Sequence, residues 1–517
     1  MPLSWRTTLE TERELVFASI PEGLSADTVN AMLRGPAGAL LRENLGAWVE
    51  RILPVDYLVP EAYRKWRPLV RDAIVFTVSR LSDERLAPKI VEQIGLPPGT
   101  PPETRLLRMI SKVPALQKLG QTLARNRHLD PSLRGALTKL ENGISDVTPG
   151  EIRQTIAREL GARLGKYAVE LESSIFSEAS VSAVMRFTWA NPVTSRRERG
   201  VFKVLKPYVP SRFHEDLAML RDLAAMFGSK DYGFNTRDVP RMMAEIARLL
   251  EREVDYAREQ AMLAEARRLY WGVPGVRVPR LFTPLCSPVV TALSEESGMK
   301  VTDAFRDGPA ARAQAGARLI EALIAVPLFS PEPGAAFHAD PHAGNLLYDE
   351  RTREIVILDW ALAERLTREQ RRQVVTMMLM LMLRDPAGVA RAVERLCPAP
   401  PASMRQMVRA FISRLPANRL PGSMDAVRML DELAFAGVLF PAPLLMFRKT
   451  LFTLDGVLND IAGDSVEMDA VAARYFLLRW MATLGLATAP LGLADLLALE
   501  WSAFWYAPRL YARALAA

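Results

Sequence analysis

One segment of this 517-residue chain constrains its fold more than any other, the run from His338 to Asn345 and the apolar stretch after it that ends at Asp359. The β-branched residues at 354–358 predict a short buried strand, so Asp359 is expected where a strand opens into a cleft. Asp340 and Asn345 precede it in a fixed order. Carboxylate and amide oxygens are ligands that suit Mg²⁺. The pattern therefore predicts a metal site beside a further carboxylate.

Each of these residues has a simpler explanation when it is taken alone, because Asp before Pro and Asn after Gly are typical turn residues. The joint order is much rarer by chance. It is the arrangement of protein kinases and their relatives, in which the first Asp faces the phosphate acceptor while the Asn and the second Asp hold the metal. The motif favours a nucleotide-binding, kinase-like site, but it does not distinguish between kinase-like families.

The composition narrows the class of protein and its partners. Hydrophobic residues make up 49% and charged residues 24% of the chain, which predicts large folded cores and several domains. The net charge of +7 favours anionic partners such as a nucleotide or phospholipid head groups. No nucleic-acid partner is expected, because zinc-finger spacing and a basic-aromatic stacking motif are absent from the sequence. Two isolated cysteines and an N-terminus without an apolar run predict a cytoplasmic protein.

The order of predicted elements fits an α+β fold of the two-lobed, protein-kinase-like kind, with a small β-containing N-lobe and a helical C-lobe. The strands predicted at 181–189 and 201–205 form a hairpin, and helical patterns dominate after 302. A Pro/Gly linker at 96–102 marks the clearest boundary. The predicted divisions are a helical N-terminal extension (1–102), a helical segment (103–170), an N-lobe (171–293), a C-lobe (294–465) and an apolar, aromatic-rich C-terminal segment (466–517).

Lys203 lies on the second arm of the hairpin. Alone it would be taken for an exposed edge lysine, but its place upstream of the Asp340 motif predicts contact with the phosphates. A helix predicted from about Arg241 supplies carboxylates, and Asp255 and Glu259 are expected on one face of it. No glycine-rich loop precedes the hairpin; the segment 177–183 has small residues and one acid, Glu178. That carboxylate would repel nucleotide unless a metal or a basic side chain offsets it.

The sequence resembles the UbiB/AarF family, the ADCK-type atypical kinases of ubiquinone biology, over roughly residues 105–400. Lys118-Leu119-Gly120-Gln121 matches the KxGQ motif of that family, Ser177–Ser180 stands at its alanine-rich loop, and Glu253-Val254-Asp255 matches its ExD motif. Lys203, Glu259, Asp340, Asn345 and Asp359 match the strand lysine, its glutamate partner, and the catalytic and metal-binding segments.

The resemblance implies ATP and Mg²⁺ as cofactors, ATPase turnover with little protein phosphorylation, and support of quinone or other lipid-metabolite biosynthesis. It assigns catalytic roles to Asp340, Lys203 and Glu259, and metal binding to Asn345 and Asp359. Nucleotide contacts are assigned to Lys203, Ala179, Ser180, Leu293 and Glu295. Lys118, Gln121, Glu253 and Asp255 are expected to restrict access to the site where other kinases receive a protein substrate.

Two alternatives remain open at this stage. A small-molecule phosphotransferase of the aminoglycoside or choline kinase type also carries His-x-Asp, Asn and a strand-borne Asp-Trp, which Asp359-Trp360 fits. The KxGQ and ExD matches argue against it. A non-catalytic scaffold regulated by nucleotide is the second alternative, because Ala361 stands where the family has Gly and Glu178 departs from the alanine-rich loop.

The uncharged run Trp480–Ala494 is shorter than the ~20 residues that span a bilayer as a helix, and Pro490 interrupts it. Aromatic residues flank it on both sides, as at a membrane interface. The run fits a pair of core helices equally well. Because family members often end in membrane helices, the resemblance favours peripheral contact with an anionic membrane surface, on the inner face of the cytoplasmic membrane, and a hydrophobic lipid or quinone intermediate as partner.

Overall fold

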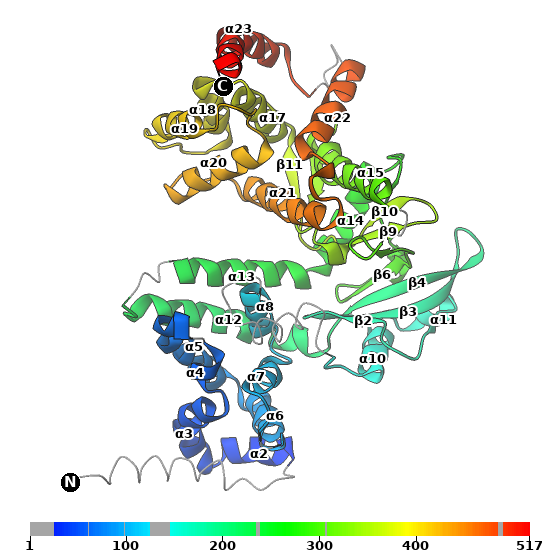
Figure 1. Ribbon diagram of the computed structural model, residues 1–517. Coiled ribbons are helices and arrows are strands. Elements are labelled where there is room, and N and C mark those ends of the chain that lie inside the picture. The colour runs from blue at the N-terminus through cyan, green and yellow to red at the C-terminus, as the bar shows by residue number, and fades with distance from the viewer. Residues whose placement is uncertain are drawn as a thin grey trace, which may run out of the picture. The chain divides into compact units, whose positions relative to one another are not determined.

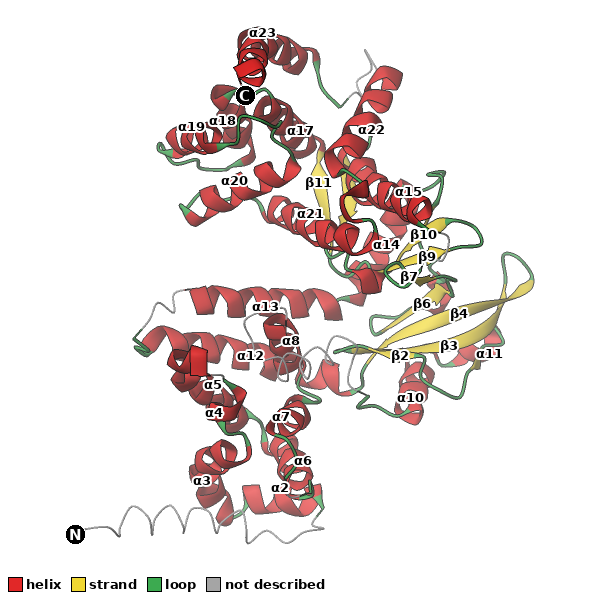
Figure 2. Ribbon diagram, in the orientation of Figure 1, coloured by secondary structure: helices red, strands yellow, loops and turns green. Residues whose placement is uncertain are grey.

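The computed structural model describes residues 25–59, 61–97, 99–124, 145–233, 238–304, 308–483 and 490–516 (Figures 1 and 2). The chain divides into two compact units. Unit 1 comprises Met1–Val254 and Pro284–Ala292, and unit 2 comprises Asp255–Thr283 and Leu293–Ala517. Each unit has its own helices and strands.

Unit 1 begins with a helical region, as the sequence predicts. Prolines precede several of its helices, where a missing backbone N–H costs nothing. The helices and 3-10 turn of this unit are α2 (Ala26–Arg34), α3 (Ala37–Ile52), α4 (Val55–Leu58), η1 (Glu61–Trp66), α5 (Arg67–Arg80), α6 (Asp83–Ile94), α7 (Pro102–Ile110), α8 (Pro114–Ala124), α10 (Pro149–Leu160), α11 (Ala162–Lys166), α12 (Tyr208–Ser229) and α13 (Asp238–Val254).

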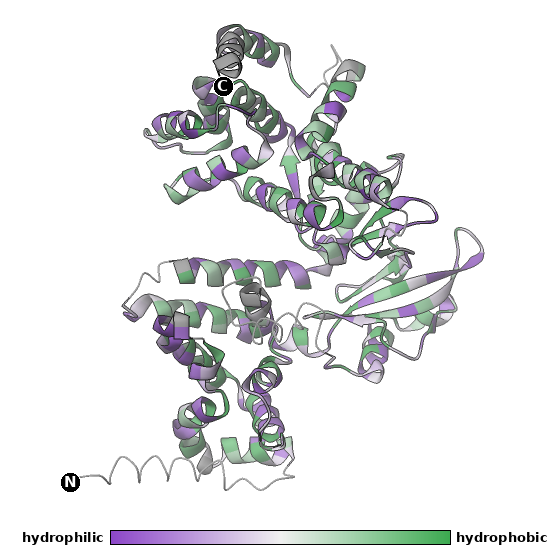
Figure 3. Ribbon diagram, in the orientation of Figure 1, coloured by the Kyte–Doolittle hydropathy of each residue, from purple (hydrophilic) through white to green (hydrophobic). Residues whose placement is uncertain are grey.

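The sheet of unit 1 is built around a long antiparallel hairpin. Its strands are β1 (Glu170–Leu171), β2 (Ser177–Glu178), β3 (Ser182–Asn191), β4 (Arg196–Leu205) and β6 (Val290–Ser294), in the order β1-β3-β4-β6 with β2 also paired to β3. The predicted hairpin is confirmed, and its strands are longer than expected. Phe187 and Phe202 stack across it with ring centroids 3.9 Å apart, while hydrophilic residues gather at its tip (Figure 3).

A buried ion pair ties the N-terminal helices to the rest of unit 1. Arg85 of α6 lies 2.6 Å from a carboxylate oxygen of Asp216 on α12, and both side chains are almost fully buried. The backbone N–H of Ala115 on α8 donates to the other oxygen of Asp216 at 3.3 Å. Three helices therefore meet at one carboxylate.

The Pro/Gly linker at 96–102 lies within unit 1. Gln93 on α6 donates to the carbonyl of Arg105 on α7 at 2.9 Å, and Arg105 donates back to the carbonyl of Gln93 at 3.0 Å. These reciprocal bonds pack the helices on either side of the linker together, so this compact unit continues through the predicted boundary.

Unit 2 carries the motif region on two small sheets. Strands β5 (Val276–Arg277), β10 (Glu354–Ile357), β9 (Leu346–Asp349) and β7 (Met299–Lys300) form one sheet in that order, and β11 (Ala363–Thr367) pairs with β8 (Gly334–His338) in the other. The strand predicted at 354–358 is β10. Its residues Ile355, Val356 and Ile357 have no exposed surface, which fixes the direction in which the chain reaches Asp359.

Helices make up the rest of unit 2. They are α14 (Tyr256–Leu269), α15 (Pro309–Ile320), a π-helical turn η3 (Glu321–Ala325), α16 (Val326–Leu328), η4 (Ala343–Asn345), α17 (Arg368–Met382), α18 (Pro386–Leu396), α19 (Met404–Arg414), α20 (Ser423–Phe435), α21 (Ala442–Ile461), η5 (Gly463–Ser465), α22 (Met468–Thr483) and α23 (Leu493–Ala516), with η2 (Thr283–Leu285) at the passage into unit 1. No helix among the described residues is long and apolar enough to cross a membrane.

The helix predicted from about Arg241, which was expected to carry both Asp255 and Glu259, is broken at Asp255, between α13 and α14. Asp255 has φ −84° and ψ 77°, outside the helical region, and its side chain accepts a hydrogen bond from the N–H of Arg258 at 3.0 Å. It is the N-cap of α14, a position that Asp favours because its carboxylate satisfies a free backbone donor. The prediction that Asp255 and Glu259 share one helix face was therefore wrong.

We expect Arg85→Met to lower the free energy of unfolding of the full chain by about 3–5 kcal/mol, because Asp216 would stay buried without its cation. Arg34→Met is the matched control: Arg34 pairs with Glu84 at 2.8 Å on an exposed surface, where such a pair contributes about 0–1 kcal/mol. Urea unfolding followed by circular dichroism would compare the two. Equal losses in the free energy of unfolding for Arg85→Met and Arg34→Met would contradict the stabilising role of the buried ion pair.

Candidate phosphoryl-transfer site

His338, the last residue of β8, organises the motif region. Its Nδ1 accepts a hydrogen bond from the backbone N–H of Asp340 at 3.3 Å, and its Nε2 lies 2.9 Å and 2.7 Å from the carbonyl oxygens of Leu358 and Asp359. The ring therefore carries its proton on Nε2 and is neutral. Burial lowers the pKa of His338, against the opposing field of Asp359. One imidazole thus joins the backbone of both motif segments.

Asn345 is oriented by the same network. Its side-chain Nδ2 donates to the carbonyl of Asp340 at 3.2 Å, and its own carbonyl accepts from the N–H of Leu358 at 2.8 Å. With the amide nitrogen directed to a backbone oxygen, the orientation of the amide oxygen is fixed as well. Asn345 is therefore held beside the residue that precedes Asp359.

Asp359 has a left-handed backbone conformation, with φ +49°. Few residues other than Gly adopt it, although Asp does so more readily than most. The conformation is imposed from both sides by buried neighbours: β10 ends at Ile357, and Trp360 donates from Nε1 to the carbonyl of Ile357 at 3.2 Å. The Oδ1 atom of Asp359 accepts a hydrogen bond from the backbone N–H of Ala361 at 3.1 Å. Asp359 is an exposed residue.

The oxygens of Asn345 and Asp359 suit a magnesium ion. Mg²⁺ is usually held by one or two protein oxygens together with substrate phosphates and water, rather than by a full set of protein ligands. Within the described ranges, no group of three or more His, Cys, Asp or Glu side chains could hold a metal. One amide and one carboxylate, both fixed by backbone bonds, fit the chemistry of a nucleotide-bound Mg²⁺.

Asp340 is 7% exposed and forms an ion pair with Lys449 on α21, whose Nζ lies 3.1 Å from Asp340 Oδ1. Sequence reasoning missed Lys449. It lies on a helix far downstream of the motif, and no local pattern marks it. A buried carboxylate needs a compensating charge or hydrogen bond. That requirement predicts a partner for Asp340, but it does not say which residue supplies it.

Unit 1 contains the predicted phosphate-contacting residues. Lys203 lies on β4 opposite Val184 of β3, half-buried. The backbone N–H of Ala179 donates to the carbonyl of Ser182 at 2.8 Å, which closes a tight turn in the segment that replaces a glycine-rich loop. Ser180, at the centre of this turn, is buried.

The turn is held from α8 by Gln117, the residue before Lys118. The Gln117 side chain is 1% exposed; its amide nitrogen donates to the carbonyl of Ser180 at 3.0 Å and its amide oxygen accepts from the N–H of Lys112 at 3.2 Å. Sequence reasoning overlooked Gln117, because an isolated Gln on a helix gives no signal. The helix that carries the KxGQ match therefore fixes the turn.

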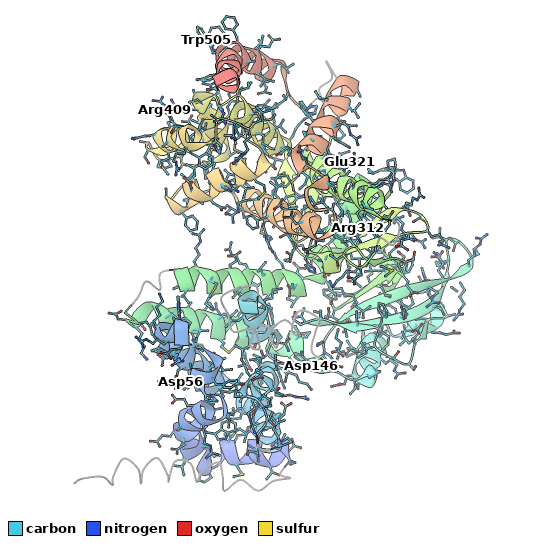
Figure 4. The ribbon with its side chains drawn as sticks, in the orientation of Figure 1. Asp56, Asp146, Arg312, Glu321, Arg409 and Trp505 are labelled. Carbon is cyan, nitrogen blue, oxygen red and sulfur yellow. The ribbon has the colours of Figure 1, made fainter. Side chains whose placement is uncertain are left out.

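Glu178 is paired with a basic side chain, one of the two conditions under which the sequence allowed a carboxylate at this position. The Nζ atom of Lys206, a residue with no exposed surface, lies 3.1 Å from Glu178 Oε2 and 2.7 Å from Asp146 Oδ1. Asp146 is labelled in Figure 4. Ser145 donates from its hydroxyl to Glu178 at 2.8 Å, and Tyr208 donates to Asp146 at 3.1 Å. Burial raises the pKa of the Tyr208 phenol. Glu178 is therefore part of a structural cluster.

Of the residues expected to restrict access, Lys118 and Glu253 form an ion pair. Both side chains are largely buried, at 15% and 16% exposed, so the KxGQ and ExD segments are joined within unit 1. Asp255 caps α14 instead of continuing α13. The side chain of Gln121 lies outside the described residues.

The predicted partner of the strand lysine, Glu259, lies on the first turn of α14 and is 4% exposed. The preceding residue, Arg258, donates to the carbonyls of Ala361 and Ala363 at 3.0 Å and 2.7 Å. These bonds tie the start of α14 to the loop that follows Asp359. The position of Glu259 is therefore coupled, within unit 2, to the segment that follows Asp359, a predicted metal ligand.

The predicted nucleotide contacts Leu293 and Glu295 flank the end of β6. Leu293 bridges to Leu281, and Glu295 lines a cavity of about 460 Å³ together with Arg267, Trp271, Arg280, Ser294 and Glu296. The fold thus gathers Asp340, Asn345 and Asp359 in one place within unit 2. Lys203, Ala179, Ser180, Lys118 and Glu253 belong to unit 1, and the functional roles of all these residues stay predictions.

Kinase-like proteins are the class that this α+β fold and motif order define. Residues 139–393 match the family model of the ABC1 atypical kinase-like domain. These residues therefore form a domain of the ABC1 atypical kinase-like family, and the resemblance to UbiB/AarF proteins is confirmed. Lys118 and Lys449 both lie outside the matched region.

The chain spans about half of the length of the two curated relatives that it matches here. Protein ACTIVITY OF BC1 COMPLEX KINASE 7, chloroplastic, of Arabidopsis thaliana is 26% identical over 70% of this chain and 52% of its own. The Synechocystis sp. protein named Uncharacterized protein sll1770 is 27% identical over 52% and 45%. A solved structure, Rv3197 of Mycobacterium tuberculosis in complex with erythromycin, aligns with a TM-score of 0.44 at 15% identity, covering 70% of this chain and 90% of that one.

We expect Lys206→Met to lower the melting temperature of the full chain by several degrees, because Asp146 and Glu178 would remain buried side by side without a cation. The variant that also carries Asp146→Asn and Glu178→Gln should recover most of the loss, since no like charges then remain. Differential scanning calorimetry would compare the two variants. Failure of the triple variant to recover would show that Lys206 acts through packing rather than charge.

Proposed function

We propose that the protein binds ATP with Mg²⁺ and transfers the γ-phosphoryl group, with water as the principal acceptor. The observation that carries this proposal is the gathering of Asp340, Asn345 and Asp359 around the neutral ring of His338. Catalysis of phosphoryl transfer is mostly positioning and electrostatic stabilisation. A site whose metal-binding and acceptor-facing groups are fixed by backbone hydrogen bonds meets that requirement.

Each residue has a defined part in the proposed reaction. Asn345 and Asp359 would hold Mg²⁺, which offsets the charge of the phosphates when it is bound. Asp340 orients the acceptor and takes its proton. The acceptor oxygen bonds to the γ-phosphorus, the bond from that phosphorus to the bridging oxygen breaks, and ADP leaves with the electron pair. With water as acceptor the products are ADP and inorganic phosphate.

The remaining assignments extend the proposal to unit 1 by resemblance. Lys203 is proposed to contact the α- and β-phosphates, with Glu259 as the carboxylate that orients it. Ala179 and Ser180, with Leu293 and Glu295, are proposed as further nucleotide contacts. The ion pair between Lys118 and Glu253 supports the view that the KxGQ and ExD segments act together to restrict access.

The physiological role that we propose is support of quinone or other lipid-metabolite biosynthesis at a membrane. The family resemblance supports the quinone role, and the Arabidopsis relative carries the name ACTIVITY OF BC1 COMPLEX KINASE 7. One helix supports membrane contact. Along α23, Leu497, Trp501, Phe504 and Trp505 are 48–70% exposed, and their spacing places them on one face. Trp505 is labelled in Figure 4.

Another face of α23 is fixed to the rest of unit 2. The Ser502 hydroxyl, 1% exposed, donates to Asp385 at the start of α18 at 2.7 Å. The aromatic face is therefore held outward, in the manner of an interfacial helix, which buries Trp and Phe at the boundary between head groups and acyl chains. The positive net charge of the chain favours an anionic surface.

We expect Asp359→Asn to abolish Mg²⁺-dependent binding of ATP, because the site loses its one proposed metal-binding carboxylate. Asp340→Asn should retain binding and lose turnover by at least about 100-fold, since general-base catalysis typically contributes 10²–10⁴-fold. Binding would be measured by isothermal titration calorimetry with and without Mg²⁺, and turnover by phosphate release. Unchanged Mg·ATP affinity in Asp359→Asn would count against the site.

The same assay separates the alternatives. Transfer of label from γ-³²P-ATP to a small alcohol in place of water would favour a small-molecule phosphotransferase, the class that Asp359-Trp360 also fits. Nucleotide binding without any turnover, in the presence and absence of anionic vesicles, would favour a scaffold whose conformation is set by nucleotide.

We expect the full chain to sediment with vesicles of phosphatidylglycerol and phosphatidylcholine, and Trp501→Ser/Phe504→Ser to lose about tenfold or more of that affinity, because two large apolar side chains contribute at least 1.4 kcal/mol on burial. The control is Trp271→Ser, which removes an exposed Trp (80%) that lies on no such helix face. Equal losses in both variants would contradict the role of α23.

A further inference from the structure

Helix α21 is held in register on strand β8, which ends at the catalytic segment. The rings of Phe447 and Phe337 meet edge to face with centroids 5.3 Å apart. Three residues further along α21, the hydroxyl of Thr450, with no exposed surface, donates to the carbonyl of His338 at 3.0 Å. Two buried contacts therefore fix both the rotation and the position of this part of α21 relative to the last residues of β8.

Lys449 lies between these two anchors and reaches the next functional position, Asp340, at 3.1 Å. The contact differs from that of an unconstrained surface lysine, because the adjacent residue, Thr450, is hydrogen-bonded to His338, two positions before Asp340. The carboxylate of Asp340 is 10% exposed, whereas the Lys449 side chain keeps 26%. A carboxylate that is buried to this extent requires a positive partner to stay ionised and oriented.

The catalytic segment does not supply such a partner from its own sequence. No Lys or Arg occurs between His338 and Asn345. The ring of His342 accepts a hydrogen bond at Nδ1 from the N–H of Gly344 at 3.1 Å and caps η4. The cation comes instead from a helix outside the region 139–393 that matches the kinase-like family model.

We propose that Lys449 is a positioning residue for Asp340 in phosphoryl transfer, an inference that rests on the proposed function. Its ammonium group holds the carboxylate in one orientation. It also offsets the repulsion between that carboxylate and the negative γ-phosphoryl group, which approach each other most closely during transfer. Both effects act on the reaction step, and neither requires Lys449 to contact the nucleotide. Loss of Lys449 should therefore lower kcat much more than it changes the affinity for Mg·ATP.

The test uses three variants of the full chain. Lys449→Met removes the charge and keeps most of the side-chain volume; Lys449→Arg keeps the charge. Arg448→Met is the matched control, because Arg448 is the adjacent residue on α21 and pairs with Asp431 on α20 instead of Asp340. All three are compared with the wild type for kcat and KM of ATP hydrolysis, for Mg·ATP affinity by calorimetry, and for melting temperature.

We expect Lys449→Met to lower kcat by about 10–100-fold, a part of the 10²–10⁴-fold that general-base catalysis contributes. KM and Mg·ATP affinity should stay within about twofold. Lys449→Arg should recover most of kcat, and Arg448→Met should leave kcat unchanged. A melting temperature of Lys449→Met that is no lower than that of Arg448→Met would separate a positioning role from a loss of folding.

Three outcomes would overturn the inference: unchanged kcat in Lys449→Met, an equal fall in kcat in Arg448→Met, or no recovery in Lys449→Arg. Each leaves the proposed function in place, provided that the wild type turns over and Asp340→Asn does not. If the wild type shows no phosphoryl transfer to water or to any alcohol, the proposed function fails first, and the role of Lys449 fails with it.

Discussion

The arrangement of the candidate site depends on one neutral imidazole. Because His338 accepts from the N–H of Asp340 and donates to the carbonyls that flank the start of the Asp359 loop, two segments separated in sequence become one rigid body. The ring does not have to touch a ligand to matter. It holds together the segments of the two carboxylates that we propose to face the acceptor and to bind the metal. Its burial, which lowers the pKa of His338, keeps the ring in the neutral form that can both accept and donate.

The local elements of this arrangement could be predicted from the sequence. The β-branched run ending before Asp359 predicts β10, and the alternation around Lys203 predicts the β3–β4 hairpin, because both depend on neighbours in the chain. Prediction from the sequence failed at Asp255. The periodicity there continues through the break between α13 and α14, and an Asp four residues before Glu259 fits a helix face as well as it fits an N-cap. Propensity alone could not decide between the two.

Long-range partners were the part that the sequence could not give. From the sequence, the carboxylate of Glu178 was expected to repel nucleotide. In the structure it lies in a buried cluster with Lys206 and Asp146. Lys449, Gln117 and Arg258 are likewise ordinary residues on ordinary helices, and each becomes significant through one tertiary contact. A motif shows which chemistry a site requires, but the groups that hold the motif residues in place need no fixed spacing, so no pattern reveals them.

The supports of the two predicted half-sites share one physical logic. In unit 1, Gln117 fixes the turn at Ser180 from α8, and in unit 2, α21 fixes Asp340 through Lys449. In both cases the support comes from a helix outside the 139–393 family match. Buried polar groups are stabilising only when they are fully partnered, so a family member that changes these helices must supply the same charge and hydrogen bonds from elsewhere. Divergence outside the motif is therefore constrained by the electrostatics of the motif itself.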